Sequence, residues 1–295
     1  MAISEDQLVT WAKQGPTAQF TATYDTLRTV LNDSSSPYYP KSFEIFLQGS
    51  YKNSTNVYGD SDVDVVIRLD SVFYTDLYFL NEEEKARYNA QRTPGDYSLD
   101  EFKTSVIAWL VKKFGSDVKP GNKAIFIKGN ATRRDADVLV CAKLRRYFSF
   151  PAYGDPSFTD GVCFFLPDGT RIDNFPERHS ENCTRKHQET REWFKHTVRI
   201  FKNFRNTMIE KNLIQDGLAP SYFIEGLLYN VPTSQFGGTE QLNFQDILNW
   251  VLAADRSTFV CANEQYKLLG NSHVTWPAAN CTAFLNVVKA YNDAS

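Results

Sequence analysis

Two aspartates, Asp62 and Asp64, open the apolar run "VDVVIRL", and a Gly-Ser pair, Gly49 and Ser50, precedes them by a short polar stretch. In a β-strand, residues two apart point to the same face, so the two carboxylates project together. A divalent cation such as Mg²⁺ is commonly held by one or two carboxylates with phosphate oxygens and water. The spacing therefore indicates a cation site, although a strand entry with solvated acids is an alternative explanation of the same pattern.

The surrounding sequence favours the cation site. The Gly-Ser pair places a hydroxyl and backbone N–H groups before the acids, which suits phosphate oxygens. A third acid, Asp137, heads another apolar run in "RRDADVLV". Two metal ions held between three carboxylates would activate a hydroxyl and stabilise a leaving pyrophosphate. Asp135 is either an alternative ligand or a strand-entry acid, and we expect Asp60 to close a turn rather than to bind metal.

The elements that position these acids follow from periodicity and turn residues. Apolar residues at helical spacing predict a helix over 17–33, and "FEIFLQGS" and "VDVVIRL" read as strands. Ser98 and Glu101 form a predicted capping box for a helix that ends at Gly115. Two hairpins are expected, one turning at residues 129–130 and the other at 168–169.

After about residue 184 the pattern becomes helical. One long amphipathic helix is predicted over 184–212, and "APSYFIEGLLYNV" predicts another. The expected fold class is α+β, with a mixed sheet in a core and a C-terminal helical lobe. We expect the core with an N-terminal helix over 1–184, the helical lobe over 185–295, and the active site in the cleft between them.

Composition limits the function further. The net charge is −3 and no run of five like charges occurs, so strong nucleic-acid binding is not expected. No stretch of eighteen apolar residues occurs, so no membrane span is expected. The five cysteines contain no C-x-x-C pair, and the first residues lack a signal-peptide pattern. We therefore expect reduced cysteines and a cytoplasmic protein.

The combination "GSYKNSTNVYGDSDVDVVI" with the later "ADVLV" resembles the nucleotidyltransferase superfamily pattern of G-S, D-x-D and a distal Asp. More closely, residues 17 to 232 resemble the cGAS/DncV-like nucleotidyltransferases, because "GTRIDNFPERHSENCTRKHQETREWFKHTVRIFKN" and "PSYFIEGLLYNVP" fit the same family. The resemblance implies that Asp62, Asp64 and Asp137 are catalytic residues that bind two Mg²⁺ or Mn²⁺ ions.

The resemblance also implies a set of nucleotide-binding residues. Ser50, with the neighbouring Gln48 and Gly49, matches the family position that holds the donor phosphates. On the long helix, Lys195, Arg199 and Lys202 share a face and are either a solvated basic stripe or, for Lys202, a triphosphate contact. Ser221 and Tyr222 match a Ser-Tyr pair at a helix start, where Tyr222 either stacks on the donor base or packs in the core. Asn174 is expected near the acceptor base, with capping of the backbone as the alternative.

The implied activity is metal-dependent nucleotidyl transfer between NTPs, with pyrophosphate leaving. ATP and a second NTP such as UTP or GTP would be joined into a cyclic di- or trinucleotide. That product would activate a downstream effector in bacterial antiphage (CBASS) defence. Two alternatives remain, a nucleotidyltransferase that modifies an RNA end or a protein, and an inactive nucleotide sensor. The four histidines, which have no metal-ligand spacing, are expected on the surface or in the core.

Overall fold

The structure is a computed structural model that describes residues 3–58 and 62–294. Contacts divide the chain into two compact units, each built from separate stretches of sequence. The helical unit comprises Met1–Thr17, Gly49–Asp60 and Glu177–Ser295, and the sheet unit comprises Ala18–Gln48 and Ser61–Pro176. The predicted domain boundary after residue 184 falls within a helix and remains a prediction.

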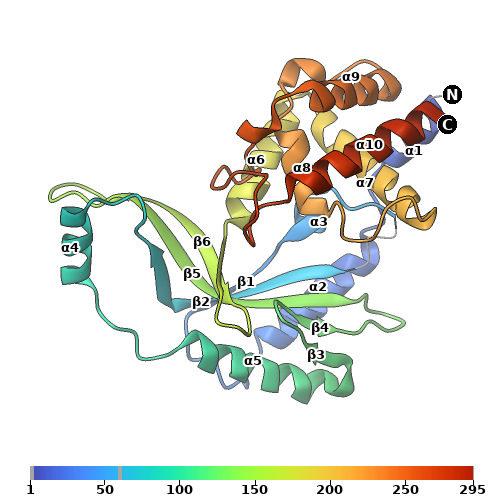
Figure 1. Cartoon of the computed structure of the whole chain (residues 1–295). Coiled ribbons are helices and arrows are strands. Elements are labelled where there is room, and N and C mark those ends of the chain that lie inside the picture. The colour runs from blue at the N-terminus through green and yellow to red at the C-terminus, as the bar shows by residue number, and fades with distance from the viewer. Residues whose placement is uncertain (1–2, 59–61, 295) are drawn as a thin grey trace. The chain divides into compact units, whose positions relative to one another are not determined.

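The sheet unit contains a mixed seven-stranded sheet, as predicted (Figure 1). Its centre is the long parallel pair β2 and β5, which run side by side, and every other pairing is antiparallel. On its other edge β5 pairs first with β4 and then with β6. The strands are β1 (Phe43–Leu47), β2 (Val63–Asp76), β3 (Val118–Pro120), β4 (Ile125–Ile127), β5 (Ala136–Ser149), β6 (Ser157–Phe165) and β7 (Arg171–Asn174).

Three α-helices belong to this unit: α2 (Ala18–Leu31), α4 (Glu82–Gln91) and α5 (Leu99–Phe114). α2 and α5 pack on the sheet and on each other, and the Trp109 indole donates a hydrogen bond of 2.8 Å to the Val30 carbonyl. The capping box that Ser98 and Glu101 predict for α5 is present. Both predicted hairpins are also confirmed, as the β4–β5 and β6–β7 pairs.

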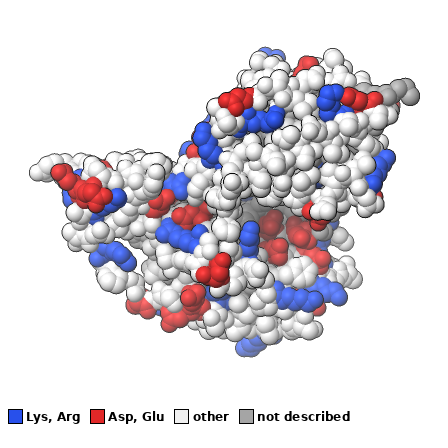
Figure 2. Space-filling model, in the orientation of Figure 1, with Lys and Arg blue, Asp and Glu red and all other residues white. Residues whose placement is uncertain are grey.

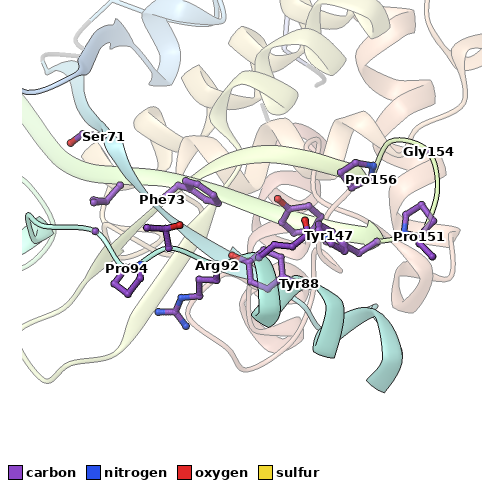
Figure 3. A pocket seen from close by; sticks show the side chains of 15 residues that line it. Ser71, Phe73, Tyr88, Arg92, Pro94, Tyr147, Pro151, Gly154 and Pro156 are labelled. Carbon is purple, nitrogen blue, oxygen red and sulfur yellow. The ribbon is translucent and has the colours of Figure 1, made fainter.

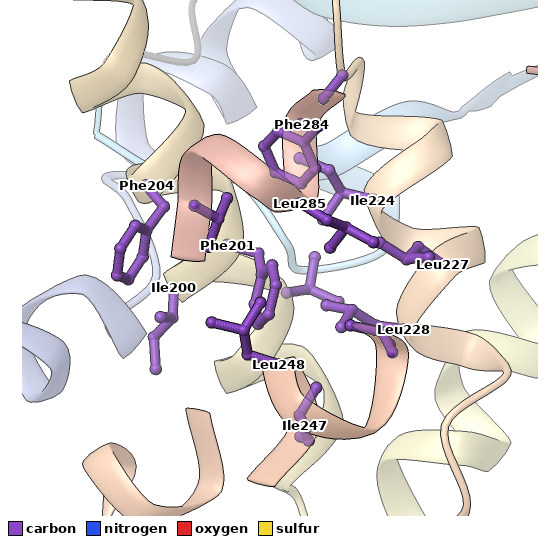
Figure 4. Packing of buried hydrophobic residues seen from close by; sticks show 14 of the residues in the cluster. Ile200, Phe201, Phe204, Ile224, Leu227, Leu228, Ile247, Leu248, Phe284 and Leu285 are labelled. Carbon is purple, nitrogen blue, oxygen red and sulfur yellow. The ribbon is translucent and has the colours of Figure 1, made fainter. Parts of the chain in front are cut away.

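The helical unit contains α1 (Glu5–Ala12), the one-turn α3 (Gly49–Lys52), α6 (Pro176–Glu189), α7 (Trp193–Glu210), α8 (Ser221–Tyr229), α9 (Glu240–Ala253) and α10 (Ala278–Ala294). Its core is apolar and close-packed around α7. Phe204 stacks on Phe244 of α9 with ring centroids 4.4 Å apart, and side chains from α8 and α10 fill the same core (Figure 4). Burial of this apolar surface is the main contribution that holds the helices together.

The single long helix predicted over 184–212 is wrong. Two helices occupy this stretch, because Arg191 and Glu192 adopt left-handed backbone conformations with φ of 51° and 71°. The Thr190 hydroxyl donates to the Lys186 carbonyl at 2.8 Å and accepts from the Phe194 N–H at 3.0 Å. Such local side-chain bonds compete with a continuous helical ladder, and here they end one helix and start the next.

All five cysteines are buried and form no disulfide, as expected for reduced thiols. None of the helices in residues 3–58 and 62–294 is both long and apolar enough to cross a membrane. On the face drawn in Figure 2, Lys and Arg side chains are scattered among acidic and uncharged residues.

Candidate functional site

The sheet brings Asp64 and Asp137 into register. Asp64 is the second residue of β2 and Asp137 the second residue of β5, and the two are paired across the parallel ladder. Residues in register on neighbouring strands have their side chains on the same face, roughly 5 Å apart at Cβ. Both side chains are half-buried, between fully buried neighbours on each strand. The apolar neighbours therefore anchor the strand starts while the acids stay accessible.

Asp62 lies just before β2 and is exposed. Burial raises the pKa of Asp137, and the negative charges of Asp62 and Asp135 raise it further. The charge of Asp62 therefore acts on Asp137, which is also in register with Asp64 on the neighbouring strand. Three carboxylates that repel one another are a suitable donor set for a divalent, oxygen-preferring cation, because the cation offsets the repulsion.

The three acids are neighbours, but their carboxylate oxygens do not form a compact ligand group. In the described ranges, the group of three ligating side chains whose ligand atoms all lie within 4.8 Å of one another is His179, Cys183 and Glu225, not the aspartates. The carboxylates of Asp62, Asp64 and Asp137 therefore do not all lie within 4.8 Å of one another. The residue types, the register of Asp64 with Asp137 and the negative charge fit Mg²⁺.

The structure favours the strand-entry role for Asp135. Its carboxylate accepts a hydrogen bond of 2.6 Å from the Gly129 N–H and so closes the turn of the β4–β5 hairpin. Its backbone carbonyl accepts from the Val63 N–H at 3.0 Å, where β2 begins. Asp135 thereby holds the two strand starts in register. Asp60, predicted to close a turn, lies outside the described residues.

The Gly-Ser turn begins where β1 ends. The Gln48 N–H donates to the Asp64 carbonyl at 3.0 Å, and the Gln48 side-chain oxygen is buried without a hydrogen-bond partner among the residues described. Gly49 has a φ of 70°, a left-handed conformation that glycine adopts at little cost. Ser50 is half-buried in α3, and its carbonyl accepts from the Thr55 N–H at 2.9 Å.

The three basic residues expected on one face of α7 are buried, so the interpretation of a solvated basic stripe is wrong. Lys195, Arg199 and Lys202 all point into the helical unit. The Lys202 ammonium is fully enclosed and donates to the Thr55 carbonyl at 2.9 Å, while Arg199 donates to the Ser54 carbonyl at 2.7 Å. These cations therefore hold the segment that follows α3.

Ser221 and Tyr222 open α8, at the position where a hydroxyl and the helix N–H groups are available. The Ser221 hydroxyl accepts a hydrogen bond of 3.2 Å from Arg205. Tyr222 is 37% exposed, its hydroxyl accepts from the Asn263 amide at 2.9 Å, and one face of its ring stacks on His179. Tyr222 thus has a fixed orientation and remains partly open to solvent, unlike a residue packed wholly in the core.

Asn174 ends β7, and its side-chain oxygen accepts a hydrogen bond of 2.8 Å from the Phe175 N–H. This is the backbone-capping arrangement that the sequence left open. The bond uses one of the two acceptor sites of the amide oxygen and leaves the amide nitrogen without a role in this cap.

Sequence reasoning missed Glu225, which is 3% exposed and belongs to α8. It accepts hydrogen bonds from Thr55, Asn53 and His179. The sequence contains one signal for it, because "FIEGLLY" places a single acid inside an apolar run. A charged side chain in such a run is almost never buried without partners.

A pocket of about 590 Å³ lies elsewhere in the sheet unit, between α4 and the C-terminal halves of β2 and β5 (Figure 3). Phe73, Tyr88 and Tyr147 line it, together with Arg92. Tyr147 is ten residues beyond Asp137 on β5, which corresponds to roughly 30 Å along a strand. No Asp or Glu of the described chain lines this pocket, so it is distinct from the acid cluster.

Comparisons with known proteins agree with this geometry. Residues 181–293 match the model of the cGAS/DncV-like nucleotidyltransferase C-terminal helical domain. The cyclic UMP-AMP synthase of Rhodothermus marinus is 41% identical over 97% of this chain and 96% of its own length. The cyclic nucleotide synthase CdnE01 of Staphylococcus haemolyticus is 35% identical over 99% of this chain and 100% of its own length.

Two solved structures share the fold over nearly the whole chain. The Rhodothermus marinus CdnE c-UMP-AMP synthase with Apcpp and Upnpp has a TM-score of 0.88 at 38% identity, covering 99% of this chain and 97% of that one. The Elizabethkingia meningoseptica CdnE cyclic dinucleotide synthase with GTP and Apcpp has a TM-score of 0.79 at 29% identity, covering 98% of each chain. With the paired strand-entry acids, these matches establish that the chain belongs to the cGAS/DncV-like nucleotidyltransferases and is a nucleotidyltransferase enzyme.

Proposed function

We propose that the enzyme joins two NTPs into a cyclic dinucleotide and releases pyrophosphate at each of the two transfers. The observation that carries this proposal is the in-register pair Asp64 and Asp137, with Asp62 beside them, in a chain closely similar to cyclic nucleotide synthases. The relative from Rhodothermus marinus is a cyclic UMP-AMP synthase, so ATP with UTP is the first substrate pair to test.

Asp62, Asp64 and Asp137 are the proposed ligands of two Mg²⁺ or Mn²⁺ ions. When bound, such ions lower the pKa of an attacking hydroxyl and stabilise negative charge on the leaving pyrophosphate. The protein's part is to hold the carboxylates in fixed positions. Paired strands hold Asp64 and Asp137 in register, and the Asp135 bond to Gly129 keeps the hairpin turn closed behind them.

Residues of the helical unit are the proposed contacts of the donor nucleotide. The Ser50 hydroxyl and the backbone around Gln48 and Gly49 would hold phosphates, and Ser221 would add a hydroxyl at the start of α8. Tyr222 would stack on the base with its solvent-facing side, since His179 fills the other.

Lys202 and Asn174 are proposed with narrower roles. The Lys202 ammonium donates a hydrogen bond to the Thr55 carbonyl, so its positive charge would stabilise the triphosphate through the segment that contains Thr55. A direct contact with the triphosphate would require this bond to break. Asn174 would read the acceptor base through its amide group, whose oxygen already accepts one bond from the Phe175 N–H.

In the cell, the product would be a second messenger that activates an effector protein in antiphage (CBASS) defence, and the enzyme would act in the cytoplasm. This role rests on the family resemblance.

The test is incubation of the purified protein with Mg²⁺ and labelled NTPs, taken singly and in pairs. Products are treated with phosphatase and analysed by mass spectrometry. A phosphatase-resistant dinucleotide made by the wild type and not by Asp62→Asn/Asp64→Asn supports the proposal. Label transferred to an added RNA or protein instead would replace it with macromolecular nucleotidyl transfer.

A further inference from the structure

A buried carboxylate joins three segments of the helical unit. Glu225 of α8 accepts a hydrogen bond from the Thr55 hydroxyl at one oxygen. Its other oxygen accepts from the Asn53 amide at 3.1 Å and contacts His179 Nε2 at 2.6 Å. The catalytic roles assigned above use none of these bonds. Burying a carboxylate is costly even when it is hydrogen-bonded, so its place in the interior requires an explanation of its own.

The contact between His179 and Glu225 is an ion pair. Burial alone would lower the pKa of His179, but Cys183 and Glu225 outweigh it and raise the pKa overall. Burial alone would raise the pKa of Glu225, yet His179, Lys202 and Thr55 lower it. Both shifts favour the charged forms, and removing either partner would leave the other buried without the hydrogen bond between His179 Nε2 and Glu225.

The pair is better explained as an ion pair than as a metal site, although Cys183 lies nearby. Two ligands of a tetrahedral zinc ion with bonds of about 2.0–2.1 Å lie roughly 3.3 Å apart. The 2.6 Å between His179 Nε2 and Glu225 Oε2 is a hydrogen-bond distance. The carboxylate is also saturated by Thr55 and Asn53.

One end of this network reaches Tyr222. The His179 ring lies nearly parallel to the Tyr222 ring, with centroids 4.7 Å apart and an interplanar angle of 24°. Tyr222 is held from a second side by the Asn263 amide. The His179–Glu225 bond therefore fixes the plane against which the tyrosine lies.

The other end reaches the loop that contains Ser50. Thr55 bonds Glu225 through its hydroxyl, accepts from Lys202 at its carbonyl, and donates its N–H to the Ser50 carbonyl. Asn53 likewise donates its N–H to the Gly49 carbonyl at 3.2 Å. A displacement of Glu225 would thus move the Gly49–Thr55 loop.

We propose that the His179–Glu225 pair is a positioning device that couples the Gly49–Thr55 loop to Tyr222, so that the contacts to the phosphates and to the base of one nucleotide form together. This inference rests on the proposed function, which places the phosphates at Ser50 and the base at Tyr222. Glu225 and His179 are positioning residues, because they act on the nucleotide through other groups.

The test is a double-mutant cycle on nucleotide binding, measured by calorimetry with Mg²⁺ and α,β-methylene ATP. Ser50→Ala and Tyr222→Ala are made singly and together, in the wild type and in Glu225→Gln. In the wild type, we expect the double variant's loss of affinity to differ at least 5-fold from the product of the single losses. In Glu225→Gln the two losses should multiply, because Glu225 accepts bonds at both oxygens, whereas Gln has one acceptor oxygen and cannot keep the bonds to both Thr55 and His179.

Thermal melts identify variants that do not fold. Thr55→Val, which removes one bond to Glu225, is the milder replacement and should also shrink the coupling. The matched control is Glu240→Gln, another buried glutamate near a histidine in the same unit, which should retain the coupling.

Multiplicative losses in the wild type, or coupling that persists in Glu225→Gln, would overturn the inference and leave the proposed function standing. If neither Ser50→Ala nor Tyr222→Ala weakens binding, the nucleotide-site assignment itself fails and the inference fails with it. A metal ion at stoichiometric level in the purified protein, lost in His179→Gln, would replace the ion pair with a metal site.

Discussion

Replacing Asp137 with Asn should stabilise the ligand-free protein while removing its activity. Burial raises the pKa of Asp137, and Asp62 and Asp135 raise it further, so the ionised carboxylate is in an unfavourable place. At an illustrative separation of roughly 6 Å, two unit charges repel by about 0.7 kcal/mol in water and about 3 kcal/mol at an effective dielectric constant of 20. Asp137 is half-buried, so screening by solvent brings the expected gain to about 1 kcal/mol.

The assay is thermal unfolding in EDTA at pH 7.5, where about 1 kcal/mol corresponds to a rise in Tm of roughly 2–4 °C. The difference from wild type should shrink as the pH falls, because a raised folded pKa means that protonation of Asp137 relieves the same repulsion in the wild type. Adding Mg²⁺ should raise the Tm of the wild type more than that of Asp137→Asn, since a ligand stabilises the state that binds it. Product formation should fall by about 100-fold or more.

Asp25→Asn is the matched control, because Asp25 is an exposed acid on α2 of the same unit. Surface substitutions of this kind usually change stability by less than about 0.5 kcal/mol. An unchanged or lower Tm for Asp137→Asn in EDTA, with the same response to Mg²⁺ as wild type, would refute the reasoning about the acid cluster.

Three further predictions use the same structure. Asp64→Asn should lower turnover by about 100-fold or more, measured as dinucleotide formed per enzyme, and near-normal turnover would remove Asp64 from the site. Tyr222→Ala should raise the KM for the donor nucleotide by roughly 5- to 150-fold, the equivalent of about 1–3 kcal/mol of base stacking, and an unchanged KM would mean that the ring only packs. The His179–Glu225 pair should give the wild type a stability that is full below pH 6.5 and is lost as the pH rises toward about 10, the raised pKa of His179. A plot of Tm against pH over that range should fall less steeply for His179→Gln than for the wild type, and equal slopes would contradict the charged pair.

Much of the sheet unit could be predicted from local patterns. The strand that carries Asp64 begins as a run of apolar residues with one acid near its start, and a run of this kind predicts a buried strand. The capping box at Ser98 and the turn at Gly169 depend on residues close in sequence, so they are also readable. The pairing of Asp64 with Asp137 is different, because a register between distant strands is fixed by the whole sheet.

The misses have physical causes. The break at Arg191 and Glu192 occurs in residues with ordinary helix propensity, and tertiary packing with the Thr190 bonds overrides it. The buried state of Lys202 is invisible in a basic helical stripe, since burial depends on the Thr55 carbonyl and the Glu225 charge from other segments.

The most direct test of the central claim is the identity of the product. Purified enzyme is given Mg²⁺, ATP and UTP, and each remaining NTP pair in parallel, and phosphatase-resistant material is analysed by mass spectrometry. We predict a cyclic dinucleotide, with pyrophosphate released in a ratio of two per product, that is absent for Asp62→Asn/Asp64→Asn. Binding of NTP without release of pyrophosphate, and with no new phosphodiester product from any pair, would contradict the claim that this acid cluster performs nucleotidyl transfer between nucleotides.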